Sequence, residues 1–259
     1  MLHVDLWWRG VNVAIDAGTY SYNAPDPWNN PLAHTAYHNT VTVDGKDQME
    51  RVGKFLWLPW VQGVVTKNIR SAQGNLAYFE GGHDGYRKLK PPVSYKRAII
   101  RLGEETWLVL DYLDSPKSHI YRLHWLLSDF GYDWNEEKGR LDLKSEKGIY
   151  HVKIGALQRN GHYSLVRADP NGPRGWQAPF YYTREPALCL SLESEADSLL
   201  FWTLFSPEEA LVTPEPLSLR IHTSETQAEV TLQRNKNPRN NIVSSVHLHG
   251  KTEDELTVF

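Results

Sequence analysis

The chain has 259 residues, a formal net charge of −3 at pH 7 and an isoelectric point near 6.4. Because basic residues are not in excess, the composition argues against partners recognised through their phosphates, whether nucleic acid or an anionic membrane surface. We find no apolar run long enough to span a bilayer and no signal peptide at the N-terminus. The length fits one large β domain or two ordinary domains.

The apolar residues are skewed toward aromatics, with 10 tryptophans and 13 tyrosines against 2 methionines. Aromatic side chains with a polar edge suit strands and surfaces that face sugars, although β-rich proteins also collect them without binding sugar. The single cysteine, Cys189, lies in the apolar sequence ALCLSL and is predicted to occupy a buried strand. One thiol cannot form an internal disulfide, so cysteine usage leaves the redox compartment open.

Alternation of apolar and polar residues predicts a β-hairpin over residues 2–16. A two-residue turn at Arg9-Gly10 aligns the apolar faces of its two strands. The expected pairs are Trp8 with Val11, Leu6 with Val13, and Val4 with Ile15. The same register puts His3 directly across from Asp16, with Cβ atoms about 4.5–5.5 Å apart, which is close enough to share a proton or a metal ion.

Residues 17–37 form a loop rich in tyrosine, tryptophan and proline, and connections of this length are typically functional or packed on themselves. The strand pattern resumes at HNTVTVD, residues 38–44, with His38 at its start. Zinc needs about four nitrogen, oxygen or sulfur ligands, and Asp16 and His38 are candidates for two of them. By spacing alone, a lone histidine beside a lone aspartate is more often a hydrogen-bonded pair.

Short alternating segments recur from residues 55–66 to residues 228–233, roughly eight to twelve residues apart. They predict an all-β fold, an antiparallel β-sandwich (super-sandwich) with long loops and at most short helices. The best helix candidate is SPEEALVTPEP, residues 206–216, where proline limits any helix to a turn or two. We assign residues 1–233 to the sandwich and residues 234–259 to a polar C-terminal tail or a final edge strand.

Two phrases, LHVDLWWRGVNVAIDAGTYSYN at residues 2–23 and HNTVTVDGKDQ at residues 38–48, resemble the start of the heparinase II/III-type domain. This domain is the β-sandwich part of a family of polysaccharide lyases that includes heparin, heparan and alginate lyases. Residues 93–113 resemble its arginine-then-aspartate strand pair, and residues 175–192 resemble its aromatic late strands. The resemblance covers about the first 205 residues.

The resemblance implies a zinc ion held by two histidines and an aspartate. Asp16 matches the aspartate and His38 of HNTV matches the second histidine. The first histidine belongs to a His-Ala-Asp phrase that precedes LHVDL in the family, so this chain is expected to lack it. His3 is the nearest imidazole, and it either substitutes as a metal ligand or, as the plainer interpretation, hydrogen-bonds to Asp16.

In the family, an (α/α) toroid that carries the principal catalytic tyrosine and histidine precedes the sandwich. The resemblance therefore implies an N-terminally truncated lyase that cleaves uronic-acid-containing polysaccharide, either glycosaminoglycan or alginate, by β-elimination. We expect the isolated chain to be inactive, and its catalytic residues stay unknown. The expected partners are an acidic polysaccharide and the missing toroid domain, and the family resemblance implies a periplasmic or secreted location.

Four side chains are candidates for binding the substrate. Tyr20, Tyr22 and Trp28 are expected to stack on sugar rings, and Arg51 to pair with a uronate carboxylate. The plainer interpretation is that the aromatics fill the core of their own loop and that the arginine stays solvated. The alternative function is a non-catalytic carbohydrate-binding or scaffold module, and an orphan fragment that aggregates is a third possibility.

Overall fold

The computed structural model describes residues 1–157, 161–233, 241–251 and 253–258. The strands of this part of the chain pair antiparallel and the helices are two short 3-10 turns, so the predicted all-β sandwich is confirmed. The chain divides into two compact units. The first comprises Met1–Gln62, Lys117–Gly131 and Gly161–Ala196; the second comprises Gly63–Pro116, Tyr132–Asn160 and Asp197–Phe259.

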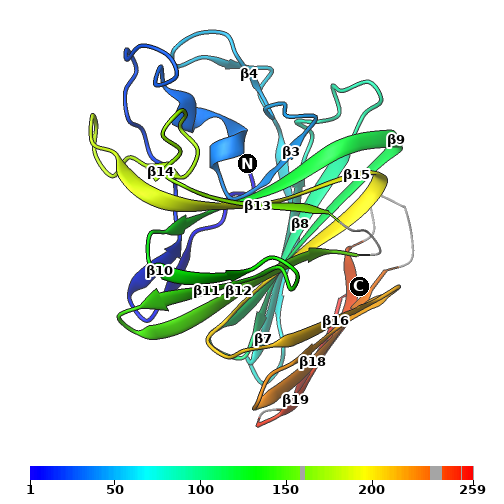
Figure 1. The fold of residues 1–259 in the computed structure, drawn as a ribbon. Helices are drawn as coiled ribbons and strands as arrows, with labels where there is room; N and C mark the ends of the chain where they lie inside the picture. The colour runs from blue at the N-terminus through cyan, green and yellow to red at the C-terminus, as the bar shows by residue number, and fades with distance from the viewer. Residues whose placement is uncertain (158–160, 234–240, 252, 259) are drawn as a thin grey trace. The chain divides into compact units, whose positions relative to one another are not determined.

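The first unit contains short strands, two 3-10 turns and parts of two long strands (Figure 1). Its short strands are β1 (Leu6–Trp8), β2 (Val11–Ala14), β3 (Val41–Val43), β4 (Glu50–Arg51), β5 (Trp57–Leu58), β13 (His162–Arg167) and β14 (Trp176–Gln177). The turns are η1 (Pro31–Ala33) and η2 (Thr35–Tyr37). The long strands, β9 (Thr106–Ser128) and β15 (Glu185–Ser206), contribute one part of their length to each unit.

The second unit adds two groups of strands to its parts of β9 and β15. The first group is β6 (Gly63–Arg70), β7 (Leu76–His83), β8 (Ser94–Leu102), β10 (Gly131–Asn135), β11 (Arg140–Ser145) and β12 (Gly148–Ala156). The second group is β16 (Leu211–Glu215), β17 (Ser218–His222), β18 (Thr226–Leu232), β19 (Val243–Gly250) and β20 (Asp254–Thr257).

The turn of the N-terminal hairpin forms as predicted. Arg9 and Gly10 have φ angles of 48° and 85°, and Trp8 pairs with Val11. Positive φ at both central residues is the signature of the two-residue turns whose twist matches that of the flanking strands. The predicted turn position is therefore confirmed.

The predicted register holds through Trp7, which lies opposite Asn12, and fails at Leu6. A bulge places Leu6 opposite Ala14, so its predicted pairing with Val13 is wrong. The extra residue of a bulge shifts every later pair and bends the strand. Because β1 begins only at Leu6, His3 lies outside the strand, and its predicted place directly across a ladder from Asp16 is also wrong.

A small core lies beneath the 17–37 loop of the first unit. Here β2 and β3 pair with β9, and β13 and β14 pair with β15. The buried core residues are Ile15, Ala17, Leu32, Leu126, Ala178, Ala187 and Cys189. Cys189 is buried on β15, as its apolar neighbours predicted. Ile15 and Ala17 anchor both sides of Asp16, and so fix the position of that side chain.

The second unit is a sandwich of two sheets. One sheet has the order β10-β11-β12-β15-β9-β8-β7-β6, and the other has the order β16-β17-β18-β19-β20. Buried side chains from both sheets belong to one hydrophobic cluster, including Tyr78, Ile100, Trp202, Ile221, Val230 and Val246. Each sheet thus buries one apolar face against the other, which is the arrangement that stabilises sandwiches.

The helix candidate at residues 206–216 is wrong. Residues Leu211–Glu215 form β16, which pairs with β17 and places Val212 in the core shared by the two sheets. Pro214 fits there because β16 is an edge strand, where a missing N–H costs no ladder hydrogen bond. None of the described helices has the length and hydropathy needed to cross a membrane.

The C-terminal region contributes the last two strands of the five-stranded sheet. β19 pairs with β18 and β20, and β20 is the edge strand. Part of the predicted tail, residues 234–240, 252 and 259, lies outside the described residues. The domain boundary placed between residues 233 and 234 from the sequence stays a prediction.

Candidate metal centre

Asp16 lies just after the N-terminal hairpin, and the residues on either side of it are buried. Ile15 is 4% exposed and Ala17 is fully buried, whereas the side chain of Asp16 is 45% exposed. Its Oδ1 accepts the backbone N–H of Gly18 at 2.7 Å, which closes a tight local turn. One carboxylate oxygen is thereby occupied, and Oδ2 is left for contacts with other side chains.

His38 follows η2 directly, in an extended conformation with φ −112° and ψ 158°. It lies three residues before β3 rather than at the start of that strand. Its Nδ1 is 3.0 Å from Oδ2 of Asp16, so the loop between the two residues folds back and brings them together. The predicted Asp16 and His38 pair is therefore formed.

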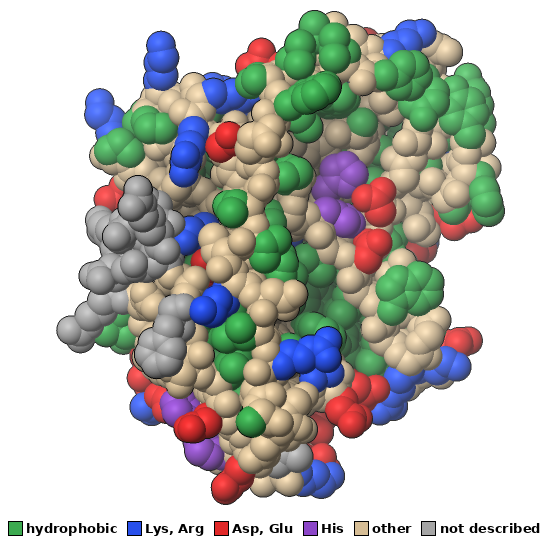
Figure 2. Space-filling model, turned by 180° about the vertical axis from the view of Figure 1, so that it is seen from behind, with side chains coloured by type: hydrophobic (Ala, Val, Ile, Leu, Met, Phe, Trp, Pro, Cys, Tyr) green, Lys and Arg blue, Asp and Glu red, His purple; other side chains and the backbone are tan. Residues whose placement is uncertain are grey.

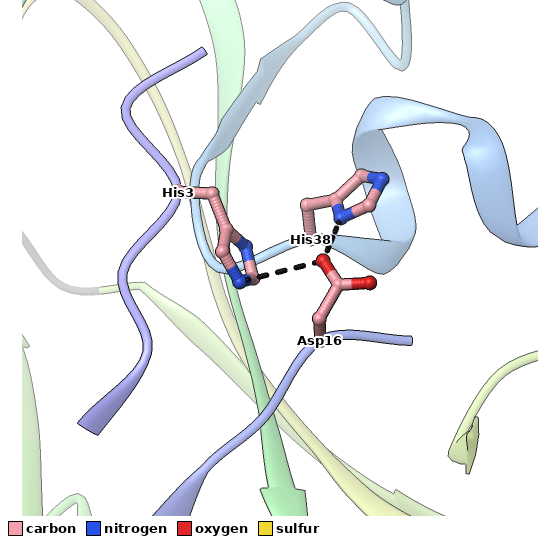
Figure 3. Close-up of side chains that lie close together, drawn as sticks. All are labelled: His3, Asp16 and His38. Atoms are coloured by element: carbon pink, nitrogen blue, oxygen red, sulfur yellow. Dashed lines mark hydrogen bonds and ion pairs between the residues drawn. The ribbon is translucent and has the colours of Figure 1, made fainter. Parts of the chain in front are cut away.

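His3 reaches the same carboxylate from the segment before β1 (Figure 3). Its Nε2 is 3.5 Å from Oδ2 of Asp16 and 2.9 Å from Oδ1 of Asp5. The rings of His3 and His38 meet edge to face, with centroids 5.4 Å apart. Potential ligand atoms of His3, Asp16 and His38 all lie within 4.8 Å of one another, and no other such group occurs among the described residues.

The charges of this cluster follow from its hydrogen bonds. The hydrogen bond with His38 lowers the pKa of the Asp16 carboxyl to about 2, although burial acts in the opposite direction. Burial lowers the pKa of His3, which outweighs the opposing effect of its hydrogen bond with Asp5. Near neutral pH the centre is therefore an anionic carboxylate beside an uncharged His3.

Zinc in tetrahedral coordination holds its nitrogen and oxygen ligands roughly 3.3 Å apart. The distances of 3.0 Å and 3.5 Å from Asp16 Oδ2 to the two imidazoles are close to this value. His38 fits a ligand role well, because the nitrogen beside Oδ2 of Asp16, Nδ1, has no other hydrogen-bond partner within the described part of the chain. His3 fits less well, because its Nδ1 already accepts the backbone N–H of Asn39 at 3.0 Å.

A pocket of about 320 Å³ opens on this cluster. Besides the three cluster residues, it is lined by Met1, Ala33, Thr35, Thr40, Gln48, Met49 and Trp57. Figure 2 shows a face of the molecule on which histidine side chains lie next to acidic ones, with hydrophobic side chains gathered nearby. The pocket combines a carboxylate and imidazoles with apolar walls, which is the composition typical of small-ligand sites.

A family model described as Heparinase II/III-like, C-terminal, matches residues 1–254. The chain belongs to this family. No curated protein matches it.

Several solved structures share the fold of this heparinase II/III-like domain. A structure described as a heparinase III gene product is 16% identical, with a TM-score of 0.66 over 98% of this chain and 36% of that chain. Heparan sulfate lyase HepC from Pedobacter heparinus is 17% identical, with a TM-score of 0.68 over 89% of this chain and 36% of that chain. The chain thus spans about a third of the length of these proteins.

Two of the predicted sugar-binding aromatics of the heparinase II/III-like domain pack around Arg184. Its guanidinium carbon lies 3.9 Å from the ring centroid of Trp28 and 4.9 Å from that of Tyr20, and the two rings contact each other. Cation–π contacts of this kind hold loops together. Arg51, the predicted partner of a uronate, donates from Nη1 to the carbonyl oxygen of Asn29 at 2.9 Å.

Tyr22 contacts further rings that the sequence reasoning missed, and these are joined to the first group by a contact between Tyr182 and Tyr20, with centroids 5.6 Å apart. The ring of Tyr22 contacts Phe55, with centroids 4.8 Å apart, and Tyr181, at 5.5 Å; Tyr181 in turn contacts Tyr182 at 4.8 Å. Phe55, Tyr181 and Tyr182 are 73%, 49% and 58% exposed. The sequence signal was the run PFYYT at residues 179–183, where three aromatics follow a proline in a loop.

Several other histidines lie elsewhere, in contact with a partner side chain. His119 binds Asp44, His124 binds Thr42 and His151 binds Asp142. His247 and His249 stack in parallel on β19, with centroids 6.5 Å apart. None of these joins the cluster at Asp16, which leaves one candidate metal centre among the described residues.

Proposed function

We propose that this chain is the C-terminal sandwich part of a polysaccharide lyase that cleaves uronic-acid-containing polysaccharide by β-elimination. The observation that carries the proposal is the conjunction of the family match over residues 1–254 with a carboxylate–imidazole cluster on a pocket. The names of the similar structures, heparinase III and heparan sulfate lyase, support an acidic glycosaminoglycan as the substrate class. Alginate is the other polymer to be tested, and a periplasmic or secreted location fits either substrate.

The proposed cofactor is zinc, with Asp16 and His38 as ligands and His3 as the third candidate. Zinc would supply a fixed positive charge that holds the 17–37 loop against the hairpin end. The carboxylate of Asp16 supports this role because it is ionised near neutral pH and has one oxygen directed at both imidazoles. With only two or three protein ligands, the affinity should be weak.

β-Elimination removes the proton alpha to a uronate carboxylate, and that proton is too weakly acidic unless the carboxylate charge is neutralised. A base must accept the proton and an acid must protonate the departing glycosidic oxygen. In this chain Nδ1 of His38 is committed to Asp16, and His3 is committed to Asp5 and Asn39. We propose that the base and the acid come from the toroid domain, as the family resemblance implies, and we expect the isolated chain to be inactive.

For the substrate, we propose that the exposed rings around Tyr22 stack on sugars, with Arg51 contributing a cation nearby. Sugar rings present apolar faces that pack on aromatic side chains. We also propose Tyr20 and Trp28 as sugar-stacking residues. They have a second role, because their packing around Arg184 holds the loop that carries Tyr22. Phe55, Tyr181 and Tyr182, the rings around Tyr22, are exposed enough for such contacts.

The test uses the full chain with heparan sulfate, alginate and uncharged dextran. Affinity electrophoresis should show retention by an acidic polymer and none by dextran, weakened at least fivefold by Tyr22→Ala. Tyr132→Ala, at a surface tyrosine of β10 that is 38% exposed, is the matched control and should leave retention unchanged. Absence of retention by either acidic polymer would contradict the substrate proposal.

A non-catalytic carbohydrate-binding module is the second candidate function, favoured by the exposed rings of Phe55, Tyr181 and Tyr182. Such a module would bind the same polymer but would not act together with a catalytic toroid domain. Adding a separately produced family toroid to the chain distinguishes the two. Release of unsaturated uronate, followed by its ultraviolet absorbance, supports the lyase part, and continued inactivity of a stable complex supports the binding module.

A further inference from the structure

Asn39 lies directly after His38 and is completely buried. Its side-chain amide donates from Nδ2 to the carbonyl oxygens of Val4, at 2.8 Å, and Ile15, at 3.1 Å. Its Oδ1 accepts the backbone N–H of Leu126 at 2.6 Å. Both amide protons and the amide oxygen are therefore used, as a buried asparagine requires.

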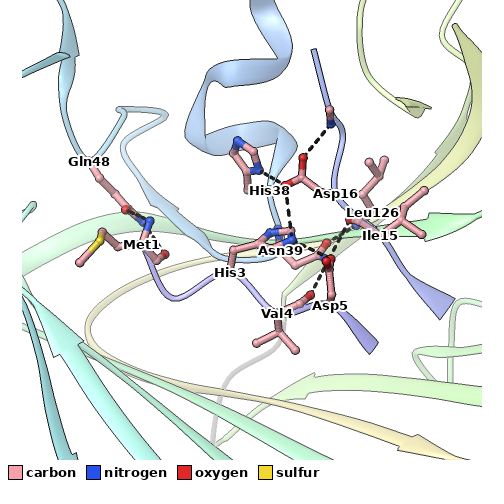
Figure 4. Close-up of polar contacts among 11 residues, drawn as sticks. Met1, His3, Val4, Asp5, Ile15, Asp16, His38, Asn39, Gln48 and Leu126 are labelled. Atoms are coloured by element: carbon pink, nitrogen blue, oxygen red, sulfur yellow. Dashed lines mark hydrogen bonds and ion pairs between the residues drawn. The ribbon is translucent and has the colours of Figure 1, made fainter. Parts of the chain in front are cut away.

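These contacts join segments that are distant in the sequence. Val4 follows His3 and Ile15 precedes Asp16, so the Asn39 amide binds the backbone next to two of the cluster residues (Figure 4). The third cluster residue, His38, directly precedes Asn39 itself. The bond to Leu126 attaches the whole arrangement to β9. Neighbouring backbone fixed in this way leaves each cluster side chain little freedom beyond its own rotamers.

The backbone of Asn39 also determines the tautomer of His3. Its N–H donates to Nδ1 of His3 at 3.0 Å, so that nitrogen is unprotonated. A neutral imidazole carries one proton, which must then sit on Nε2, facing the carboxylates of Asp5 and Asp16. A metal ligand nitrogen must instead be unprotonated, so coordination through Nε2 would require breaking the bond from Asn39.

We propose that Asn39 is the positioning residue of this centre, and that it holds His3 as a hydrogen-bond donor to Asp5, beside Asp16, rather than as a metal ligand. Of the three residues in this cluster, Asp16 and His38 are then the two metal ligands. The part that concerns metal rests on the proposed zinc site, whereas the arrangement of hydrogen bonds does not. An Asn39→Asp substitution would remove both amide protons and place a carboxylate oxygen against two carbonyl oxygens. A side chain of the same size is therefore not sufficient at this position, which needs two N–H donors.

The first test is nitrogen-15 NMR of the metal-free wild-type chain. Long-range spectra of the imidazoles should show a single His3 tautomer protonated at Nε2, and the side-chain NH₂ of Asn39 should be protected from solvent exchange. On adding zinc, the nitrogen that shifts as a metal ligand should belong to His38, with His3 keeping its proton. A His3 protonated at Nδ1, or coordinated through Nε2, would overturn the proposal.

The second test compares Asn39→Ala with Asn12→Ala. Asn12 lies on β2, and its Oδ1 has no partner among the described residues, which makes it a matched control. Asn39→Ala should give a mixture of His3 tautomers and at least a tenfold loss of zinc affinity, with Asn12→Ala within twofold of wild type. Unchanged tautomer and affinity in a folded Asn39→Ala chain would overturn the positioning role.

These readouts separate the two proposals. If the wild-type chain binds no zinc, the zinc part of the proposed function fails, while the tautomer of His3 still decides the role of Asn39. If Asn39→Ala does not fold, the wild-type tautomer and the protection of the Asn39 amide decide it instead.

Discussion

Nδ1 of His38 lies 3.0 Å from Oδ2 of Asp16, across a separation of 22 positions in the sequence. The 17–37 loop makes this contact possible by returning over its own core of Ala17, Leu32 and Ala178. Two residues on separate segments meet only if both segments are fixed. Substitutions that disturb the packing of the 17–37 loop should therefore also change the position of Asp16 relative to His38, and with it the binding of zinc.

Gly18 belongs to both the packing of the loop and the hydrogen bonding of Asp16. A Cβ at Gly18, which has φ +69°, would lie 2.2 Å from the carbonyl oxygen of Ala178, closer than any real contact. Gly18→Ala should destabilise the chain by about 2–4 kcal/mol, combining the left-handed backbone strain with the clash. It should also weaken zinc binding, because the N–H of Gly18 orients Asp16.

Gly10→Ala is the control for this prediction. Gly10 also has positive φ, +85°, but nothing lies within 4 Å of a Cβ built there. Its cost should be limited to the backbone strain, roughly 1–2 kcal/mol. Urea unfolding of both variants measures the difference, and equal losses would show that the contact with Ala178 is unimportant.

A buried ion pair stabilises the sheet of the second unit. Arg97 donates from Nε and Nη2 to the two oxygens of Asp111, at 2.7 Å and 3.0 Å, and both side chains are almost completely buried. Asp111→Asn leaves a buried guanidinium without its counter-charge, which should cost about 3–5 kcal/mol in unfolding experiments. Asp133→Asn, in an exposed pair with Lys144, should cost less than about 1 kcal/mol. Similar losses in both variants would contradict this account.

Much of this fold could be predicted from alternation in the sequence. The turn at Arg9-Gly10, the buried position of Cys189 and the sandwich class follow from local patterns. The hairpin register could not be predicted, because the bulge between Leu6 and Trp7 depends on how β2 fits against β9. The strand at residues 211–215 was missed for a similar reason, since its partner and its edge position are tertiary features.

The candidate centre was predictable in part. The approach of Asp16 to His38 agrees with the sequence interpretation. His3 reaches the same carboxylate, but from an irregular segment whose Leu2 has φ 56° rather than from a strand. The role of Asn39 could not be predicted, because the backbone groups that it binds belong to three separate segments.

His124 should make the stability of the chain depend on pH. Burial lowers its pKa to about 3 from an ordinary value of 6.5, and its Nε2 contacts Oγ1 of Thr42 at 2.8 Å. Between these pH values the unfolded chain binds a proton that the folded chain does not. Its contribution to stability is therefore fully present above about pH 6.5 and is lost as the pH falls toward 3.

A His124→Gln variant tests this dependence. Between pH 6 and pH 4, the unfolding free energy of the wild-type chain should fall more steeply with decreasing pH than that of the variant. The two slopes should differ by about 1.4 kcal/mol per pH unit, the value for one proton. His247→Gln, at a histidine whose side chain is 40% exposed, is the control and should keep the wild-type slope. A His124→Gln slope equal to that of wild type would show that another group is responsible.

Titration of the metal-free chain with zinc by calorimetry tests the central assignment most directly. Wild type should bind one zinc ion weakly, Asp16→Ala and His38→Ala should each lose at least tenfold in affinity, and His151→Ala should bind as wild type. His151 is a suitable control because it forms a similar contact with Asp142, 2.6 Å long, in the second unit. Zinc binding that is unchanged in Asp16→Ala or His38→Ala, or absent from wild type, would contradict the assignment.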